Sequence, residues 1–143
     1  MTNPTQTPAN VFHGEGERIL VVDDDPAILE ILGSGLRTMG FEVTALPDAA
    51  AALPILRQPD TVDLLILDCI MPGMSGATLL RTLSAEGIEI PVLLISGVNE
   101  DQLRLDPQLR DLPFLAKPFL FLHLSQALSQ LLERESCCGT KPA

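Results

Sequence analysis

The sequence predicts a doubly wound α/β fold, in which helices cover both faces of a five-stranded parallel sheet. Short apolar runs alternate along the chain with segments whose apolar residues recur at helical spacing. The run Leu64-Leu65-Ile66-Leu67 is apolar at every position, as in a strand that is buried on both faces of a parallel sheet. Most of these runs end directly at a polar or charged residue, and parallel strands bring such ends to one edge.

The expected strands are short and are bounded by turn residues. The third ends at Asp68, after which Pro72-Gly73 requires a loop. The fourth has Pro91 near its start, where a missing backbone donor is tolerated. In chain order, the strands are expected over residues 18–22, 41–46, 62–68, 90–95 and 114–116.

The first expected helix has clear start and stop signals. Pro26 suits the first helical position, and Asp25 can cap it. Gly40 ends the helix. Gly33 and Gly35 lie inside it and weaken it by roughly 1 kcal/mol each relative to alanine.

The later helices show more irregular signals. Asp48 caps an alanine-rich helix, which Pro54 is expected to kink or split because proline removes a backbone donor. Ser75 caps a helix over Gly76–Ala85. The remaining segments are 99–112, expected as one short helix or two broken turns around Pro107, and a last helix over 120–134.

Length and composition indicate one globular domain. The 143 residues are 46% apolar and 20% charged, which is unlike a disordered chain. Residues 1–17 show no periodicity and are expected to form a flexible arm. The domain is expected over 18–134 and a tail over 135–143.

Charge and apolar patterning disfavour two classes of partner. The net charge of −10 disfavours nucleic acid, because phosphate binding needs a basic surface. No apolar run approaches the length of a membrane span, and no signal segment opens the chain. The three cysteines lack metal-binding spacing, so free thiols in a reducing cytoplasm are expected.

Side chains that carry chemistry follow four of the expected strands and should converge at one edge of the sheet. Clustered carboxylates repel each other unless a cation compensates, and hard oxygen ligands suit Mg²⁺. A carboxylate, a hard cation, a lysine and a hydroxyl are the groups needed to move a phosphoryl group, with Asp68 as the possible nucleophile. The alternative is an acidic capping loop beside an unrelated surface lysine. The converging residues are Asp23, Asp24, Asp68, Ser96 and Lys117.

Four stretches carry these residues: Ile19-Leu20-Val21-Val22-Asp23-Asp24-Asp25-Pro26, Leu67-Asp68-Cys69-Ile70-Met71-Pro72-Gly73-Met74-Ser75-Gly76, Ile95-Ser96-Gly97 and Lys117-Pro118-Phe119. Together they resemble the signatures of two-component response-regulator receiver domains. The resemblance covers about residues 18–133, and the stretches occur in the family's order.

The resemblance implies a flavodoxin-like sheet of strand order 2-1-3-4-5 and a set of metal ligands. Asp68 matches the phosphoacceptor of the family and is also one of the implied metal ligands. Asp23 and Asp24 match the acidic pair that binds Mg²⁺ (or Mn²⁺), with Asp24 the more direct ligand. The backbone carbonyl of Ile70 matches the third protein ligand.

The resemblance also implies how the domain is phosphorylated and what responds. Ser96 and Lys117 match the hydroxyl and the lysine that contact the phosphoryl group, and Phe114 matches the aromatic switch residue. The family takes its phosphoryl group from a histidine kinase or a histidine phosphotransfer protein, and signals to a downstream protein or through a homodimer. Such a domain assists its own phosphorylation and dephosphorylation but is not otherwise an enzyme. Ile95-Ser96-Gly97 is also similar to receivers of hybrid histidine kinases.

Rival functions fit the residues less well. A receiver that acts only as a binding module would not need the complete set of Asp68, Ser96 and Lys117. A phosphatase of the haloacid dehalogenase type needs an aspartate two positions after the nucleophile, and that position is Ile70. A flavin or nucleotide binder needs a glycine-rich loop where this chain has three aspartates.

The last helix departs from the family pattern at its start. It opens with Leu120-Phe121-Leu122 instead of a polar cap. Three consecutive helical positions span most of the circumference, so at least one of these side chains is expected to stay exposed. His123 is expected on the helix surface.

Overall fold

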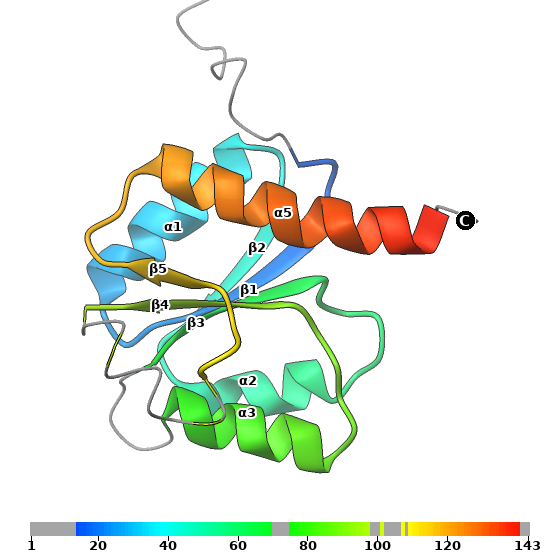
Figure 1. Cartoon of the computed structure of the whole chain (residues 1–143). Helices are drawn as coiled ribbons and strands as arrows, with labels where there is room; N and C mark the ends of the chain where they lie inside the picture. Colours follow the sequence, from blue (N-terminus) through cyan, green and yellow to red (C-terminus); the bar gives the residue numbers. More distant parts are fainter. Residues whose placement is uncertain (1–13, 70–74, 98–100, 102–106, 108, 141–143) are drawn as a thin grey trace, which may run out of the picture.

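The chain forms one five-stranded sheet with all pairings parallel (Figure 1). The computed structural model describes residues 14–69, 75–97, 101, 107 and 109–140. The strand order is β2-β1-β3-β4-β5, which confirms both the predicted fold class and the 2-1-3-4-5 order. The strands are β1 Arg18–Val22, β2 Glu42–Leu46, β3 Leu64–Asp68, β4 Val92–Ser96 and β5 Phe114–Ala116.

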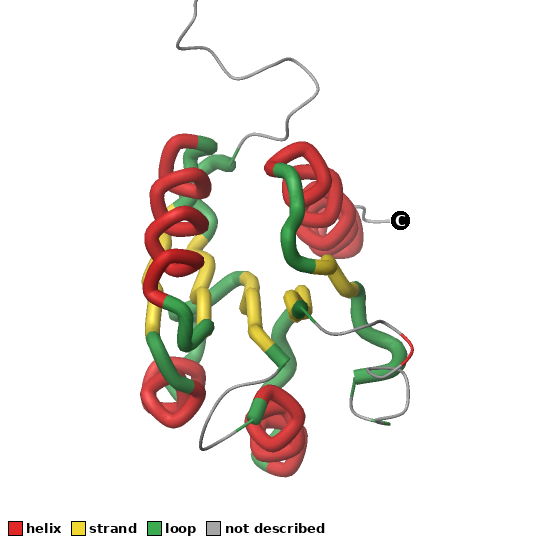
Figure 2. The backbone as a smooth tube through the Cα atoms, turned by 90° about the vertical axis from the view of Figure 1, so that its left-hand side faces the viewer, coloured by secondary structure: helices red, strands yellow, loops and turns green. Residues whose placement is uncertain are grey.

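Helices cover both faces of this sheet (Figures 1 and 2). α1 and α5 lie on one face, and α2 and α3 on the other. The helical segment expected over 99–112 lies largely outside the described residues. α5 continues to Thr140, beyond the end expected at residue 134. The helices are α1 Pro26–Thr38, α2 Ala49–Leu56, α3 Gly76–Ala85 and α5 Phe121–Thr140.

Alternate residues of the central strands pack into two separate hydrophobic clusters. In β3, Leu64 and Ile66 face α1 and α5, whereas Leu65 and Leu67 face α2 and α3. All four side chains are fully buried. This is why the strand is apolar at every position: each face of the sheet is covered by a helical layer.

The predicted caps start the helices. The carboxylate of Asp25 accepts a hydrogen bond from the backbone N–H of Ala27 at 2.9 Å, and Asp48 accepts one from Ala51 at 2.8 Å. Ser75 starts α3 in the same way, by accepting from the N–H of Thr78 at 3.2 Å. Each cap satisfies a backbone donor that the first turn of a helix leaves unpaired.

Pro54 was expected to kink or split α2, and the split does not occur. The helix is continuous from Ala49 to Leu56, with Pro54 in its last turn. A proline there removes one backbone hydrogen bond but leaves the first turn intact. The buried side chains of Ala52, Leu53 and Leu56 hold the helix against the sheet on both sides of Pro54.

Residues 14–17, the described part of the expected arm, run beside the turn between α1 and β2. Gly14 donates a backbone hydrogen bond to Met39 at 2.6 Å, and Gly16 donates one to Gly40 at 2.9 Å. Gly40 has a φ of 101°, and a Cβ atom on it would lie 2.5 Å from the Gly14 carbonyl oxygen. A glycine is therefore required at position 40 both by the backbone conformation and by the close approach of the Gly14 backbone.

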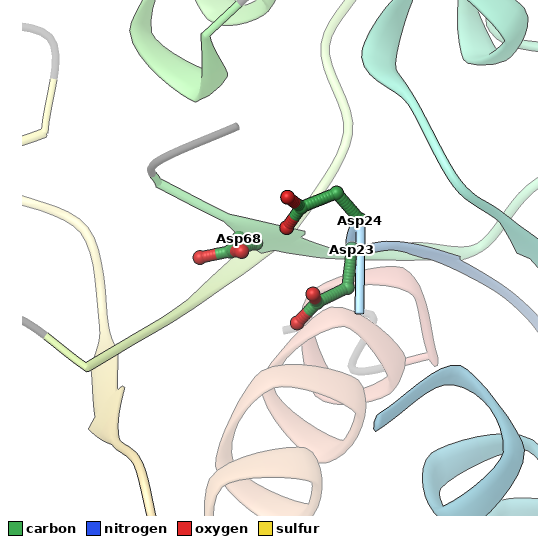
Figure 3. A group of neighbouring side chains, drawn as sticks. All are labelled: Asp23, Asp24 and Asp68. Atoms are coloured by element: carbon green, nitrogen blue, oxygen red, sulfur yellow. The ribbon is translucent and has the colours of Figure 1, made fainter. Parts of the chain in front are cut away.

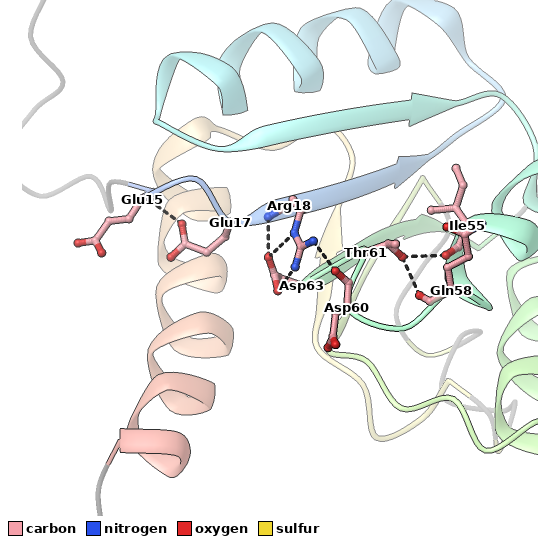
Figure 4. Close-up of polar contacts among 8 residues, drawn as sticks. All are labelled: Glu15, Glu17, Arg18, Ile55, Gln58, Asp60, Thr61 and Asp63. Atoms are coloured by element: carbon pink, nitrogen blue, oxygen red, sulfur yellow. Dashed lines mark hydrogen bonds and ion pairs between the residues drawn. The ribbon is translucent and has the colours of Figure 1, made fainter.

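A polar contact joins the starts of the two central strands (Figure 4). The backbone N–H of Arg18 donates to Asp63 Oδ2 at 2.8 Å, and its Nε donates to the same oxygen at 3.3 Å. The guanidinium also donates to the carbonyl of Asp60. Because these side chains are partly exposed, their ion pair adds little to the stability of the fold. We attribute to it mainly the alignment of β1 with β3.

The start of α5 packs on a glycine of α1. A Cβ atom on Gly35 would lie 2.3 Å from the ring of Phe121. The helix-weakening glycine thus allows the ring to lie against the α1 backbone. Leu120 is 64% exposed and Phe121 37% exposed, which confirms the expectation for this helix start. His123 is exposed, as expected.

No helix in the described part of the chain is long and apolar enough to cross a lipid bilayer.

The contrast between neighbouring residues of α1 gives a test of this packing. Leu32 is fully buried and Ile31 is 52% exposed. We expect Leu32→Ala to lower the free energy of unfolding by about 2–5 kcal/mol, because it leaves a cavity in the core. The matched control Ile31→Ala should change it by less than about 1 kcal/mol. Urea unfolding measures both, and equal losses would contradict this assignment of the core face.

Candidate functional site

Three carboxylates meet where β1 and β3 end (Figure 3). Asp23 and Asp24 follow β1, and Asp68 is the last residue of β3. Val22 and Leu67 are register partners in the parallel pair, so the residues that follow them are also neighbours. One carboxylate oxygen of each aspartate lies within 4.8 Å of those of the other two. The convergence predicted for these residues is therefore present in the fold.

The three aspartates differ in their environment. Asp23 and Asp68 are buried, with exposed fractions of 0% and 4%, whereas Asp24 is exposed. Asp23 Oδ1 accepts a hydrogen bond from the backbone N–H of Asp25 at 2.9 Å. Asp25 in turn caps α1, as predicted. The loop backbone therefore fixes the orientation of the Asp23 carboxylate, and Asp24 lies on the solvent side of the cluster.

Lys117 compensates the buried charge. It follows β5, and its backbone N–H donates to the Ser96 carbonyl at 2.8 Å. Its Nζ lies 2.7 Å from Asp23 Oδ2 and 3.5 Å from Asp68 Oδ2. Asp23 Oδ2 is inaccessible to solvent, and Lys117 Nζ is its close ion-pair partner.

The pKa of Lys117 reflects two opposing effects. Burial lowers the pKa, because it penalises the charged form. Contact with the Asp23 carboxylate and the charge of Asp68 raise it by more, so the pKa lies above the ordinary value of 10.5. Lys117 is therefore protonated at neutral pH and supplies a fixed positive charge to the cluster.

Ser96 and Phe114 lie on the strands beside this cluster. Ser96 ends β4, is 1% exposed, and follows Ile95, the register partner of Asp68. Phe114 is paired with Leu94, two residues before Ser96 on the same face of β4. The Phe114 ring is half-buried against the core cluster on the α2 and α3 side.

Ile70, whose carbonyl was expected as a third protein ligand, lies outside the described residues. The described donors nevertheless fit a hard divalent cation. Asp23, Asp24 and Asp68 offer only oxygen ligands, and exposed Asp24 leaves one side open to water. Mg²⁺ prefers such a set and retains several of its waters.

One contact was not predictable from the sequence. Lys117 lies closer to Asp23 than to Asp68, although the resemblance relates this lysine to a phosphoryl group carried by Asp68. The order of residues along the chain shows only that Lys117 follows a strand. Which carboxylate it reaches depends on the width of the sheet between β5 and β1, and no sequence signal carries that distance.

Comparison with known proteins identifies the same family along most of the chain. The model of the response regulator receiver domain matches residues 19–129. The transcriptional regulatory protein PrrA of Mycobacterium tuberculosis is 34% identical over 126 residues, which cover 86% of this chain and 53% of that protein. The chain thus spans about half the length of such curated relatives.

Solved structures agree with this result. A response regulator receiver domain protein from Clostridium thermocellum superimposes with a TM-score of 0.75 at 27% identity, over 85% of this chain and 98% of that one. The response regulator TrrA from Thermotoga maritima, solved in complex with Mg²⁺-BeF, gives 0.70 at 30% identity, over 80% and 98%. This chain belongs to the family of response-regulator receiver domains of two-component systems.

Proposed function

We propose that this receiver domain accepts a phosphoryl group on Asp68 from the phosphohistidine of a histidine kinase or a histidine phosphotransfer protein, in the presence of Mg²⁺. The observation that carries the proposal is the buried Asp68 carboxylate at the end of a central strand, beside two further carboxylates and a lysine. Family membership supports the donor class, since kinases and phosphotransfer proteins are the general partners of receivers.

The proposed reaction is an in-line displacement at phosphorus. An Asp68 oxygen forms a bond to phosphorus while the bond from phosphorus to the donor imidazole nitrogen breaks. The electron pair of the broken bond stays on that nitrogen. The imidazole is released as a neutral ring when one of its two nitrogens holds a proton. The protein contributes position and charge, because such a transfer needs little covalent chemistry beyond the nucleophile.

Each site residue then has a distinct role. Asp23 and Asp24 would hold Mg²⁺, which neutralises charge on the phosphoryl oxygens when bound. Lys117 Nζ, already 3.5 Å from Asp68 Oδ2, would form an ion pair with the phosphorylated side chain. Ser96 would donate its hydroxyl hydrogen to a phosphoryl oxygen. The backbone carbonyl of Ile70 stays a predicted metal ligand.

Signalling would begin at Ser96. Movement of its hydroxyl toward a phosphoryl group would vacate space beside β4. This space lies on the face of the sheet that also carries the Phe114 side chain. The Phe114 ring carries no hydroxyl, so turning inward would bury no polar group. The altered surface would then be recognised by a downstream protein or by a second copy of the chain. We expect this to happen in the cytoplasm.

The phosphoacceptor is tested by radiolabelling with a small phosphodonor such as phosphoramidate. We expect Mg²⁺-dependent labelling of the natural chain and none of Asp68→Asn, because the amide is a poor nucleophile. Asp48→Asn is the matched control, since asparagine caps a helix as well as aspartate. It should label like the natural chain. Label retained by Asp68→Asn would disprove the assignment.

Lys117→Met tests the charge compensation. In metal-free protein it should lower the free energy of unfolding by about 3 kcal/mol, because it leaves the Asp23 carboxylate buried and unpaired. Added Mg²⁺ should stabilise this variant more than the natural chain, since the cation no longer competes with the lysine. Arg57→Met, which removes only an exposed ion pair with Glu86, is the control and should show no such Mg²⁺ effect.

The pH dependence of this difference has a definite sign. The Lys117 pKa is raised, so its stabilising contribution is complete below the ordinary lysine value of 10.5 and is lost as pH rises through the raised pKa. Chemical unfolding of both proteins between neutral and strongly alkaline pH measures it. A stability difference that grows at high pH would contradict the ion pair.

The switch is tested by NMR with beryllofluoride, a phosphate mimic. With Mg²⁺ we expect resonances of Phe114 and of residues 98–122 to shift, and Ser96→Ala to suppress the shift, because the hydroxyl couples the two sites. Changes confined to the loops around Asp24 and Asp68 would instead mean that the phosphorylation site lacks this switch.

A further inference from the structure

We propose that Gly76 is a positioning residue for the phosphoacceptor. Its missing side chain lets the first turn of α3 close onto the backbone of Asp68 and Cys69, and this contact sets the position of the Asp68 carboxylate in the acidic cluster. The inference rests on the proposed role of Asp68 and adds a residue that touches neither the metal nor the phosphoryl group.

The contact is between backbones. A Cβ atom on Gly76 would lie 2.9 Å from the Asp68 carbonyl oxygen, 3.1 Å from Cys69 Cα and 3.4 Å from the Cys69 carbonyl oxygen. The first two distances are shorter than ordinary contacts between carbon and these atoms. Flexible side chains could turn away from an added methyl group, but these backbone atoms cannot. The Gly76 N–H also donates to the Cys69 carbonyl at 3.3 Å.

Neither partner in this contact has room to retreat. Asp68 is paired with Ile95 of β4, and the Cys69 N–H donates to the Ile95 carbonyl at 3.1 Å. On the other side, α3 is fixed by Leu79 and Leu83, which are buried in the core. An added methyl group must therefore shift either the end of β3 or the helix, and the atom nearest to it belongs to Asp68.

The backbone conformation of Gly76 does not by itself require glycine. Among the described glycines a positive φ occurs at Gly16, Gly40 and Gly87, and not at Gly76. Gly76 is the first residue of α3, directly after the Ser75 cap, where many residues are accepted. The close approach to Asp68 and Cys69 is thus the reason for glycine here.

Gly76→Ala in the full chain tests the proposal with two measurements. The first is Mg²⁺ affinity by calorimetric titration, and the second is the initial rate of labelling by phosphoramidate. We expect both to fall about tenfold, as for other changes that move a ligand without removing it. Circular dichroism and thermal unfolding report separately on folding.

Gly33→Ala is the matched control. It also adds a methyl group to a buried glycine, but the nearest atom is the flexible end of the Arg37 side chain, at 3.2 Å. We expect natural Mg²⁺ affinity and labelling rate for it. Should Gly76→Ala be partly unfolded, both measurements are repeated in sucrose, which favours the compact state.

The outcomes separate this inference from the proposed function. If Gly76→Ala is less stable but keeps the natural Mg²⁺ affinity and labelling rate in its folded form, Gly76 serves only the fold and the inference is overturned. If the natural chain itself is not labelled, or if Asp68→Asn is labelled, the proposed function fails. A tenfold loss in Gly76→Ala, with the natural chain and Gly33→Ala labelled normally, supports both.

Discussion

Repulsion among three neighbouring carboxylates is the constraint around which this domain is built. Asp23 and Asp68 are buried at adjacent strand ends, where water cannot screen their charges. Lys117 relieves the repulsion, and it reaches the cluster only because β5 pairs with β4. β5 is a strand of only three residues, yet it positions Lys117, the residue that follows it, whose positive charge compensates the buried acids. A metal ion bound between the carboxylates would reduce the same repulsion. The metal ion and Lys117 would therefore compensate the same negative charge.

The sheet gives this charged edge a rigid support. β1, β3 and β4 are apolar on both faces and are held between two layers of helices, so their ends cannot move independently. Asp68 belongs to a paired strand and not to a free loop. Two glycines also allow close packing around the sheet. Gly35 lies against an aromatic ring and Gly76 against another stretch of backbone, and neither site has room for a side chain. They weaken local helical preference but allow closer packing between elements.

The exposed start of α5 lies close in sequence to the site. Leu120 and Phe121 follow Lys117 within one short loop, and the Phe121 ring rests on Gly35 of α1. Lys117, whose Nζ lies in the acidic cluster, and the apolar residues at the surface are therefore parts of one connection. The covalent chain and the packing of Phe121 on Gly35 join the acidic cluster to the surface of α1 and α5.

The sequence by itself determined the fold class, the strand order through family resemblance, the helix caps and the residues that meet at the acidic edge. It could do so because apolar periodicity reports burial, and because parallel strands always end on the same side. It misplaced boundaries: β3 was expected from residue 62 and begins at Leu64, since pairing with a partner, not apolarity, defines a strand. It also predicted a kink or a split at Pro54, and α2 is not split there because its packing on the core prevailed. Only the tertiary structure decided that Lys117 pairs most closely with Asp23, and that α3 touches the backbone of Asp68. Both depend on distances between elements remote in sequence, which local residue patterns do not encode.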